Sequence, residues 1–198
     1  MATLQISLAE YLRTSYHPDR DYVDGEVQER NLGEFDHGAV QGFLTSWFFQ
    51  HRQEWQLHVI PELRIRVSAT RVRITDVCLI SRTQPIEQVP TKPPLAVIEI
   101  LSPEDRIARY NERLSDYRNM GIQNVWVIDP INAVGYDCST AAWLPNEEFR
   151  VAGSPIFLRL SDLRVRSEPL RGPNLFLHSL PRAAHFLHQS GKHLSRLT

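Results

Sequence analysis

The chain has 198 residues, of which 42% are hydrophobic and 23% are charged, and its formal net charge is −1. The length and composition predict one globular domain with a hydrophobic core, with enough residues left for an appendage. The near-zero net charge gives no overall electrostatic argument for nucleic-acid binding, although a local basic patch could still support it. No apolar run approaches the ~20 residues of a membrane span and the N-terminus lacks a signal-peptide pattern, so we expect a cytoplasmic protein without a membrane partner.

The first predicted elements are a short helix and a hairpin. Residues Ser7–Thr14 read SLAEYLRT, in which Ser7 can cap a helix and a glutamate three residues later completes a capping box. Residues Tyr22–Arg30 surround Asp24-Gly25, a pair typical of the tight turn between two strands.

A long helix and an extended segment follow. Residues Glu34–Arg52 repeat apolar and aromatic side chains at a helical period, which predicts one long helix. Residues Trp55–Val67 indicate two strand segments broken near Pro61. The aromatic side chains here exceed what one helix face needs, so we also consider a homodimer contact. These aromatic residues are Trp47, Phe48, Phe49 and Trp55.

Two acidic residues interrupt the apolar pattern of the next two strands. Alternation along Arg71–Ser81 places Asp76 on an otherwise hydrophobic face, and alternation along Pro94–Leu101 does the same for Glu99. A buried carboxylate without a partner is costly, so it needs a metal ion, a cation or a proton. Two such carboxylates on consecutive strands predict one shared site.

The segment after these strands predicts a helix and a parallel strand. Ser102 can cap a helix that begins at Pro103, and Gly121 is a typical helix end. Residues Asn124–Asp129 form a short apolar strand. A strand, a helix and a strand in this order indicate a crossover connection, so Leu95–Leu101 and Asn124–Asp129 should be parallel. The apolar stripe of the helix is Ile107, Tyr110, Leu114 and Tyr117.

Further strands are predicted near Ala133–Cys138, Ala142–Leu144 and Ile156–Leu160. We therefore expect a mixed α/β domain over residues 1–163 and a basic C-terminal extension over residues 164–198. The two cysteines, Cys78 and Cys138, fall in strand-like runs. We expect buried free thiols, and a disulfide is the alternative.

The acid pair suggests a metal site. Hard divalent cations take oxygen ligands, and Mg²⁺ commonly uses one or two carboxylates with waters and phosphates. Asp76, Glu99 and the main-chain carbonyl of Ile100 could supply such a half-shell, with Glu26 as a third acid. A bound Mg²⁺ or Mn²⁺ ion could activate water and stabilise charge on a phosphoryl oxygen. The alternative is a buried network of arginines and carboxylates.

Three basic side chains are candidate neighbours of the pair. Arg106 and Arg113 lie about two turns apart on one edge of the helical stripe, where either could reach the carboxylates or a phosphate. A solvated charge is the alternative for each. His37 opens the long helix, where a packed or capping role is the alternative to a nucleic-acid contact.

Five motifs occur in a fixed order. They are D-G-E at Asp24–Glu26, Asp36-His37, R-x-x-D-V at Arg73–Val77, P-L-A-V-I-E-I-L-S-P at Pro94–Pro103 and V-W-V-I-D-P at Val125–Pro130. Together they resemble the Uma-two family of restriction-endonuclease-like proteins, a branch of the PD-(D/E)XK nuclease superfamily. The resemblance covers about residues 7–163.

The resemblance implies a restriction-endonuclease-like fold, a mixed sheet flanked by helices, and Mg²⁺- or Mn²⁺-dependent hydrolysis of phosphodiester bonds in DNA. It implies that Asp76 and Glu99 are the motif acids and that Glu26 is the early acid. Leu101 occupies the position of the motif lysine. In this family a lysine often sits on the following helix instead, at the position of Arg113. Because guanidinium stays protonated, Arg113 would position water or stabilise transition-state charge and would not act as a base.

Two functions are compatible with these residues. The first is a metal-dependent DNA endonuclease in which Glu26, Asp76, Glu99 and Arg113 are catalytic and Arg106 contacts the DNA backbone. The alternative is a catalytically inactive nuclease-fold protein that binds nucleic acid or a protein partner. The missing motif lysine and the near-neutral charge favour this alternative.

Overall fold

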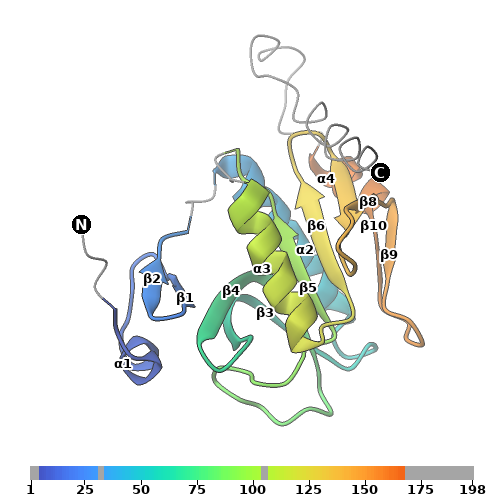
Figure 1. The fold of residues 1–198 in the computed structure, drawn as a ribbon. Helices are drawn as coiled ribbons and strands as arrows, with labels where there is room; N and C mark the ends of the chain where they lie inside the picture. Colours follow the sequence, from blue (N-terminus) through green and yellow to red (C-terminus); the bar gives the residue numbers. More distant parts are fainter. Residues whose placement is uncertain (1–4, 31–33, 104–106, 168–198) are drawn as a thin grey trace, which may run out of the picture. The chain divides into compact units, whose positions relative to one another are not determined.

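A mixed sheet organises the chain in the computed structural model, which describes residues 5–30, 34–103 and 107–167 (Figure 1). Over these residues the sheet has eight strands in the order β2-β1-β4-β5-β6-β7-β8, with β3 paired to β4. A separate two-stranded sheet is formed by β9 and β10. The described residues belong to one compact unit that ends at Ser167.

The elements are, in chain order, α1 (Leu8–Arg13), β1 (Asp21–Val23), β2 (Glu26–Gln28), α2 (Phe35–His51), β3 (Leu57–Arg66), β4 (Arg71–Ser81), β5 (Ala96–Ile100), α3 (Ile107–Met120), β6 (Val125–Asp129), β7 (Val134–Asp137), β8 (Leu144–Pro145), β9 (Glu148–Arg150), β10 (Phe157–Arg159) and α4 (Leu160–Ser167).

The N-terminal predictions are confirmed. The Ser7 side chain caps α1 by accepting a hydrogen bond from the Glu10 N–H at 3.1 Å. The β1–β2 turn has positive φ angles at Asp24 and Gly25, 50° and 99°, a conformation that Gly, Asn and Asp adopt most readily.

The predicted division into two strands near Pro61 is wrong, because β3 extends from Leu57 to Arg66. The strand is distorted there, however, since Glu62 has a φ of 51° and does not appear in the register with β4. Its register with β4 is the same on both sides of the proline, from Leu57↔Ser81 to Arg66↔Val72. Among the described strands β3 pairs only with β4, so it is an edge strand, where a residue without an N–H is tolerated.

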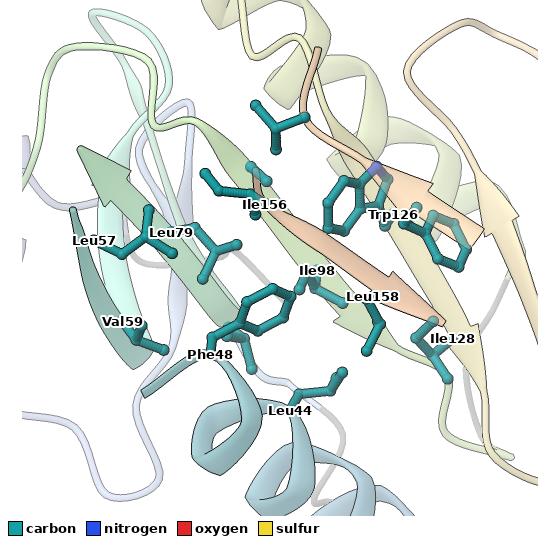
Figure 2. Close-up of a cluster of buried hydrophobic side chains, with 14 of the residues drawn as sticks. Leu44, Phe48, Leu57, Val59, Leu79, Ile98, Trp126, Ile128, Ile156 and Leu158 are labelled. Atoms are coloured by element: carbon teal, nitrogen blue, oxygen red, sulfur yellow. The ribbon is translucent and has the colours of Figure 1, made fainter. Parts of the chain in front are cut away.

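Two helices cover opposite faces of the sheet. The α2 side chains Leu44 and Phe48 pack on one face, and β9, β10 and α4 complete this core. Figure 2 shows these side chains pointing toward residues of β3–β6 and β10 around a common centre. On the other face, Tyr110, Leu114 and Tyr117 of α3 pack against β4, β5 and β6. Strands β4 and β5 are therefore buried on both faces, so the polar side chains that they carry, such as Asp76 and Glu99, are buried as well.

The crossover prediction is confirmed, since β5 and β6 are parallel and α3 connects them. Gly121, with a φ of +96°, follows the last residue of α3. Ile107 is half exposed and is not part of the buried stripe. The helix start predicted at Ser102–Asp105 falls partly on residues 104–106, outside the described residues.

The aromatic residues that prompted the homodimer prediction mostly serve the core of this chain. Phe48 and Trp55 are buried, and both Trp47 and Trp55 contact Phe157 of β10. Phe49 remains half exposed, with the Arg52 guanidinium over its ring. A homodimer stays a prediction.

Both cysteines are free thiols in buried positions, as expected. Among the residues that the structure describes, no helix is long and apolar enough to span a membrane. Helix α4 crosses the expected domain boundary at residue 163, and residues 168–198 of the expected basic extension lie outside the described part of the chain.

Candidate active site

The acidic residues gather where the sheet divides. One edge of β4 pairs with β1 at Arg71 and Val72 and with β5 from Val77 onward. We call the intervening β4 residues 73–76 the fork, because neither strand pairs with them. Two carboxylates take the place of strand partners there. Asp21 accepts a hydrogen bond from the Ile74 N–H at 3.0 Å, and Asp76 accepts one from the Ile100 N–H at 2.7 Å.

Asp76 and Glu99 lie on the same face of the sheet. The last β4–β5 pair is Val77↔Ile98, so the next position in this register sets Asp76 opposite Glu99. By alternation both side chains share a face with Cys78 and Val97, the face covered by α3. Both acids are almost fully buried. The structure thus brings the two predicted acids together.

Two basic side chains hold the Asp76 carboxylate. Arg30 Nη2 lies 2.6 Å from Asp76 Oδ1, and His37 Nε2 lies 3.3 Å from Asp76 Oδ2. Burial raises the pKa of Asp76, but the hydrogen bond from His37 and the charge of Arg30 outweigh it and hold the pKa below its ordinary value. His37, which the sequence suggested as a nucleic-acid contact, therefore pairs with a candidate metal ligand.

Two α3 side chains, one helical turn apart, hold Glu99. Arg113 Nη1 lies 3.0 Å from Glu99 Oε2, and the Tyr117 hydroxyl donates to Glu99 Oε1 at 2.6 Å. Burial and the neighbouring charge of Asp76 together raise the pKa of Glu99 to about 7, because they outweigh the lowering by Arg113, Arg30 and the Tyr117 hydrogen bond. The pKa of Arg113 lies above its ordinary value because Asp21 and Glu99 outweigh the effect of burial.

Asp21 takes the place near the site that the sequence assigned to Glu26. Asp21 Oδ2 lies 3.0 Å from Arg113 Nη2 and 3.0 Å from Arg73 Nη1. Glu26 pairs with Val23, which in turn pairs with Arg71 at the far end of β4. The hairpin register therefore sets Glu26 five residues along β4 from Asp76, and among the described contacts none joins the two.

Two further predicted site residues are Arg106 and Ile100. Arg106 lies outside the described residues. Ile100 contributes its N–H to Asp76, and the role of its carbonyl as a metal ligand stays a prediction. Sequence reasoning missed Arg30, which gave no pattern signal. It also missed Asp21, because all three residues of β1 are buried and so short a strand gives no signal from alternation.

Asp76 and Glu99 offer carboxylate oxygens, the type of ligand that a hard divalent cation prefers. Mg²⁺ needs only one or two carboxylates, with waters and phosphate oxygens completing its shell. Asp76 and Glu99 supply two carboxylates whose mutual repulsion raises the pKa of Glu99, a repulsion that a cation between them would relieve. Within residues 5–30, 34–103 and 107–167, no group of three or more His, Cys, Asp or Glu side chains could hold an ion. A divalent ion bound at this site would have Asp76 and Glu99 as its carboxylate ligands.

The raised pKa of Glu99 predicts a pH-dependent stability. Its folded pKa of about 7 exceeds the ordinary 4.5, so its contribution is full below 4.5 and is lost as pH rises toward 7. We expect the free energy of unfolding, measured with urea in a chelator, to fall by ~3 kcal/mol more across this window in the wild type than in Glu99→Gln. The half-exposed Glu112, changed to Gln, is the control and should keep the wild-type slope. Equal slopes in wild type and Glu99→Gln would contradict the assignment.

Comparison with known proteins identifies the family of the chain. The sequence model of the family Uma2, described as "Putative restriction endonuclease", matches residues 8–134. The chain belongs to the Uma2 family. None of the curated proteins compared with it matches.

One solved structure supports the fold of this Uma2 chain. The crystal structure of a putative nuclease belonging to DUF820 from Anabaena variabilis aligns with a TM-score of 0.63 and 20% identity, over 80% of this chain and 97% of that chain. The predicted restriction-endonuclease-like fold, a mixed sheet flanked by helices, is confirmed. The DrdV–DNA complex, solved by electron cryomicroscopy, aligns at a TM-score of 0.37 with 14% identity, over 67% of this chain and 10% of that chain.

Proposed function

We propose that this Uma2 protein is a metal-dependent endonuclease that hydrolyses phosphodiester bonds in DNA. The observation that carries the proposal is the placement of two buried carboxylates, Asp76 and Glu99, on neighbouring strands beside the always-protonated Arg113. Burying two like charges is costly, which favours a functional reason for the pair. The family's description as restriction endonucleases supports the same reading.

In this mechanism Asp76 and Glu99 would hold Mg²⁺ or Mn²⁺. The ion supplies an activated water and stabilises charge on the phosphoryl oxygens. Tyr117 and Arg113 fix the Glu99 carboxylate from two directions. Arg113 also provides a positive charge that favours the negative charge developing on the phosphate, but it takes no proton. Arg106, which directly precedes the first residue of α3 in the sequence, is proposed to contact the DNA backbone.

A second function has its own supporting observation. Each oxygen of Asp76 and Glu99 already has a protein partner, namely Arg30, His37, the Ile100 N–H, Arg113 or Tyr117. Leu101 stands at the motif-lysine position. These features favour a catalytically inactive nuclease-fold protein that binds nucleic acid or a protein.

Metal binding separates the two functions. We expect calorimetric titration with Mn²⁺ to detect binding to the wild type, with loss of the signal in Asp76→Asn and in Glu99→Gln. The wild-type protein should cleave supercoiled DNA only when Mn²⁺ or Mg²⁺ is present, and it should not cleave single-stranded or double-stranded RNA. Absence of both binding and cleavage in the folded wild type would favour the inactive binding protein.

A further inference from the structure

Asp21 is a buried acid at the fork that the proposed mechanism leaves without a role. It is 2% exposed and lies in β1, a strand of three residues. Its Oδ1 accepts the Ile74 N–H, and its Oδ2 lies 3.0 Å from both Arg73 Nη1 and Arg113 Nη2. One carboxylate thus contacts the β4 backbone and two guanidinium groups.

The contact with Arg113 connects Asp21 to the acid pair. The two Nη atoms of Arg113 are divided between Asp21 and Glu99, each at 3.0 Å. A guanidinium is planar, so carboxylates bonded to its two ends fix its orientation as well as its position. Arginine side chains lose considerable rotamer freedom when they are held, and a second anchor reduces the freedom that Arg113 would keep if Glu99 alone held it.

We infer that Asp21 is a positioning residue of this site: it orients the Arg113 guanidinium toward Glu99 and acts on phosphodiester hydrolysis only through Arg113. The inference rests on the proposed nuclease function for its catalytic consequence. The early acid of the site is then Asp21 on β1, in place of Glu26 on β2.

A merely structural role is the competing explanation, because Asp21 also pairs with the buried Arg73. Asp116 of α3 provides a matched control. It is also buried, and its Oδ2 accepts from Arg73 Nε at 2.7 Å, yet among the described contacts it has none with Arg113 or Glu99. Asp21→Asn and Asp116→Asn therefore each remove one carboxylate charge from Arg73, and only the first also releases Arg113.

The first measurement does not depend on DNA cleavage. We expect ¹⁵N NMR of arginine side chains to show slow rotation of the Arg113 guanidinium in the wild type and in Asp116→Asn, and fast rotation in Asp21→Asn. Unchanged rotation in a folded Asp21→Asn protein would overturn the inference, whether or not the protein cleaves DNA.

The second readout is cleavage. Asp21→Asn should lower kcat about 10- to 100-fold with little change in KM, the usual effect of losing a group that orients a site residue. Asp116→Asn should retain wild-type kcat. In an Arg113→Met background, Asp21→Asn should lower the residual kcat no further. Additive losses in the double variant would show that Asp21 acts by another route. If the wild type neither binds Mn²⁺ nor cleaves, the nuclease proposal fails, and the rotation measurement still decides whether Asp21 positions Arg113.

Discussion

Asp76→Asn is expected to abolish Mn²⁺-dependent cleavage, with a fall in rate of at least about 100-fold, which corresponds to roughly 3 kcal/mol of lost transition-state stabilisation. The amide keeps the size of the carboxylate and one oxygen that can accept the Ile100 N–H. It loses the negative charge that a divalent ion requires. The measurement is the initial rate of nicking of supercoiled DNA, in parallel with Mn²⁺ calorimetry.

Asparagine is the informative substitution, because alanine would also remove the acceptor of the Ile100 N–H. Both substitutions remove the negative partner of Arg30, so the folding of the variant is measured alongside its cleavage. Asp76 is the buried partner of Arg30, and removing one member of a buried ion pair typically costs about 3–5 kcal/mol. Asp19→Asn is the control, since Asp19 also pairs with an arginine, Arg64, and among the described contacts it has none with the residues that hold Asp76 or Glu99. Wild-type cleavage by a folded Asp76→Asn protein would rule out Asp76 as a metal ligand.

The acid pair could be predicted because it depends on local rules. Strand alternation has a period of two, so an acid flanked at i±2 by apolar residues must share their face. Asp76 beside Cys78, and Glu99 beside Val97, follow this rule. The capping of α1 by Ser7 and the end of α3 at Gly121 are equally local, and the structure has both.

The rest of the site depends on tertiary pairing that no local pattern specifies. Asp21 reaches the fork only because β1 and β5 share one edge of β4, and a strand of three residues is too short to show alternation clearly. Arg30 follows β2 and belongs to no regular element, yet it reaches Asp76 46 positions later. Glu26 failed to join the site for the same reason, because the pairing of β1 with β4 sets Val23, its hairpin partner, opposite Arg71 at the far end of β4.

The largest effect on stability is expected at Arg73. Its side chain is fully buried and lies between Asp21 and Asp116. Arg73→Met would leave both carboxylates in a buried environment with one cation fewer, so we expect a loss of about 3 kcal/mol, at the lower end for a broken buried pair. The lower end is expected because Asp21 keeps Arg113 and Asp116 keeps Arg71. Urea unfolding at pH 7 in a chelator measures this difference in free energy.

Arg71→Met tests whether burial, rather than the number of ion pairs, sets the loss of stability. Arg71 pairs with three carboxylates, those of Asp24, Glu112 and Asp116, whereas close pairs of Arg73 involve two. If the number of ion pairs set the effect, Arg71 would matter more. Arg71 is a quarter exposed, however, so water screens its charge and can solvate the carboxylates it leaves, and we expect a loss of only ~1 kcal/mol or less. An equal or larger loss for Arg71→Met would mean that burial does not control the energetics of this network, and the argument that buried charge at the fork reflects function would lose its basis.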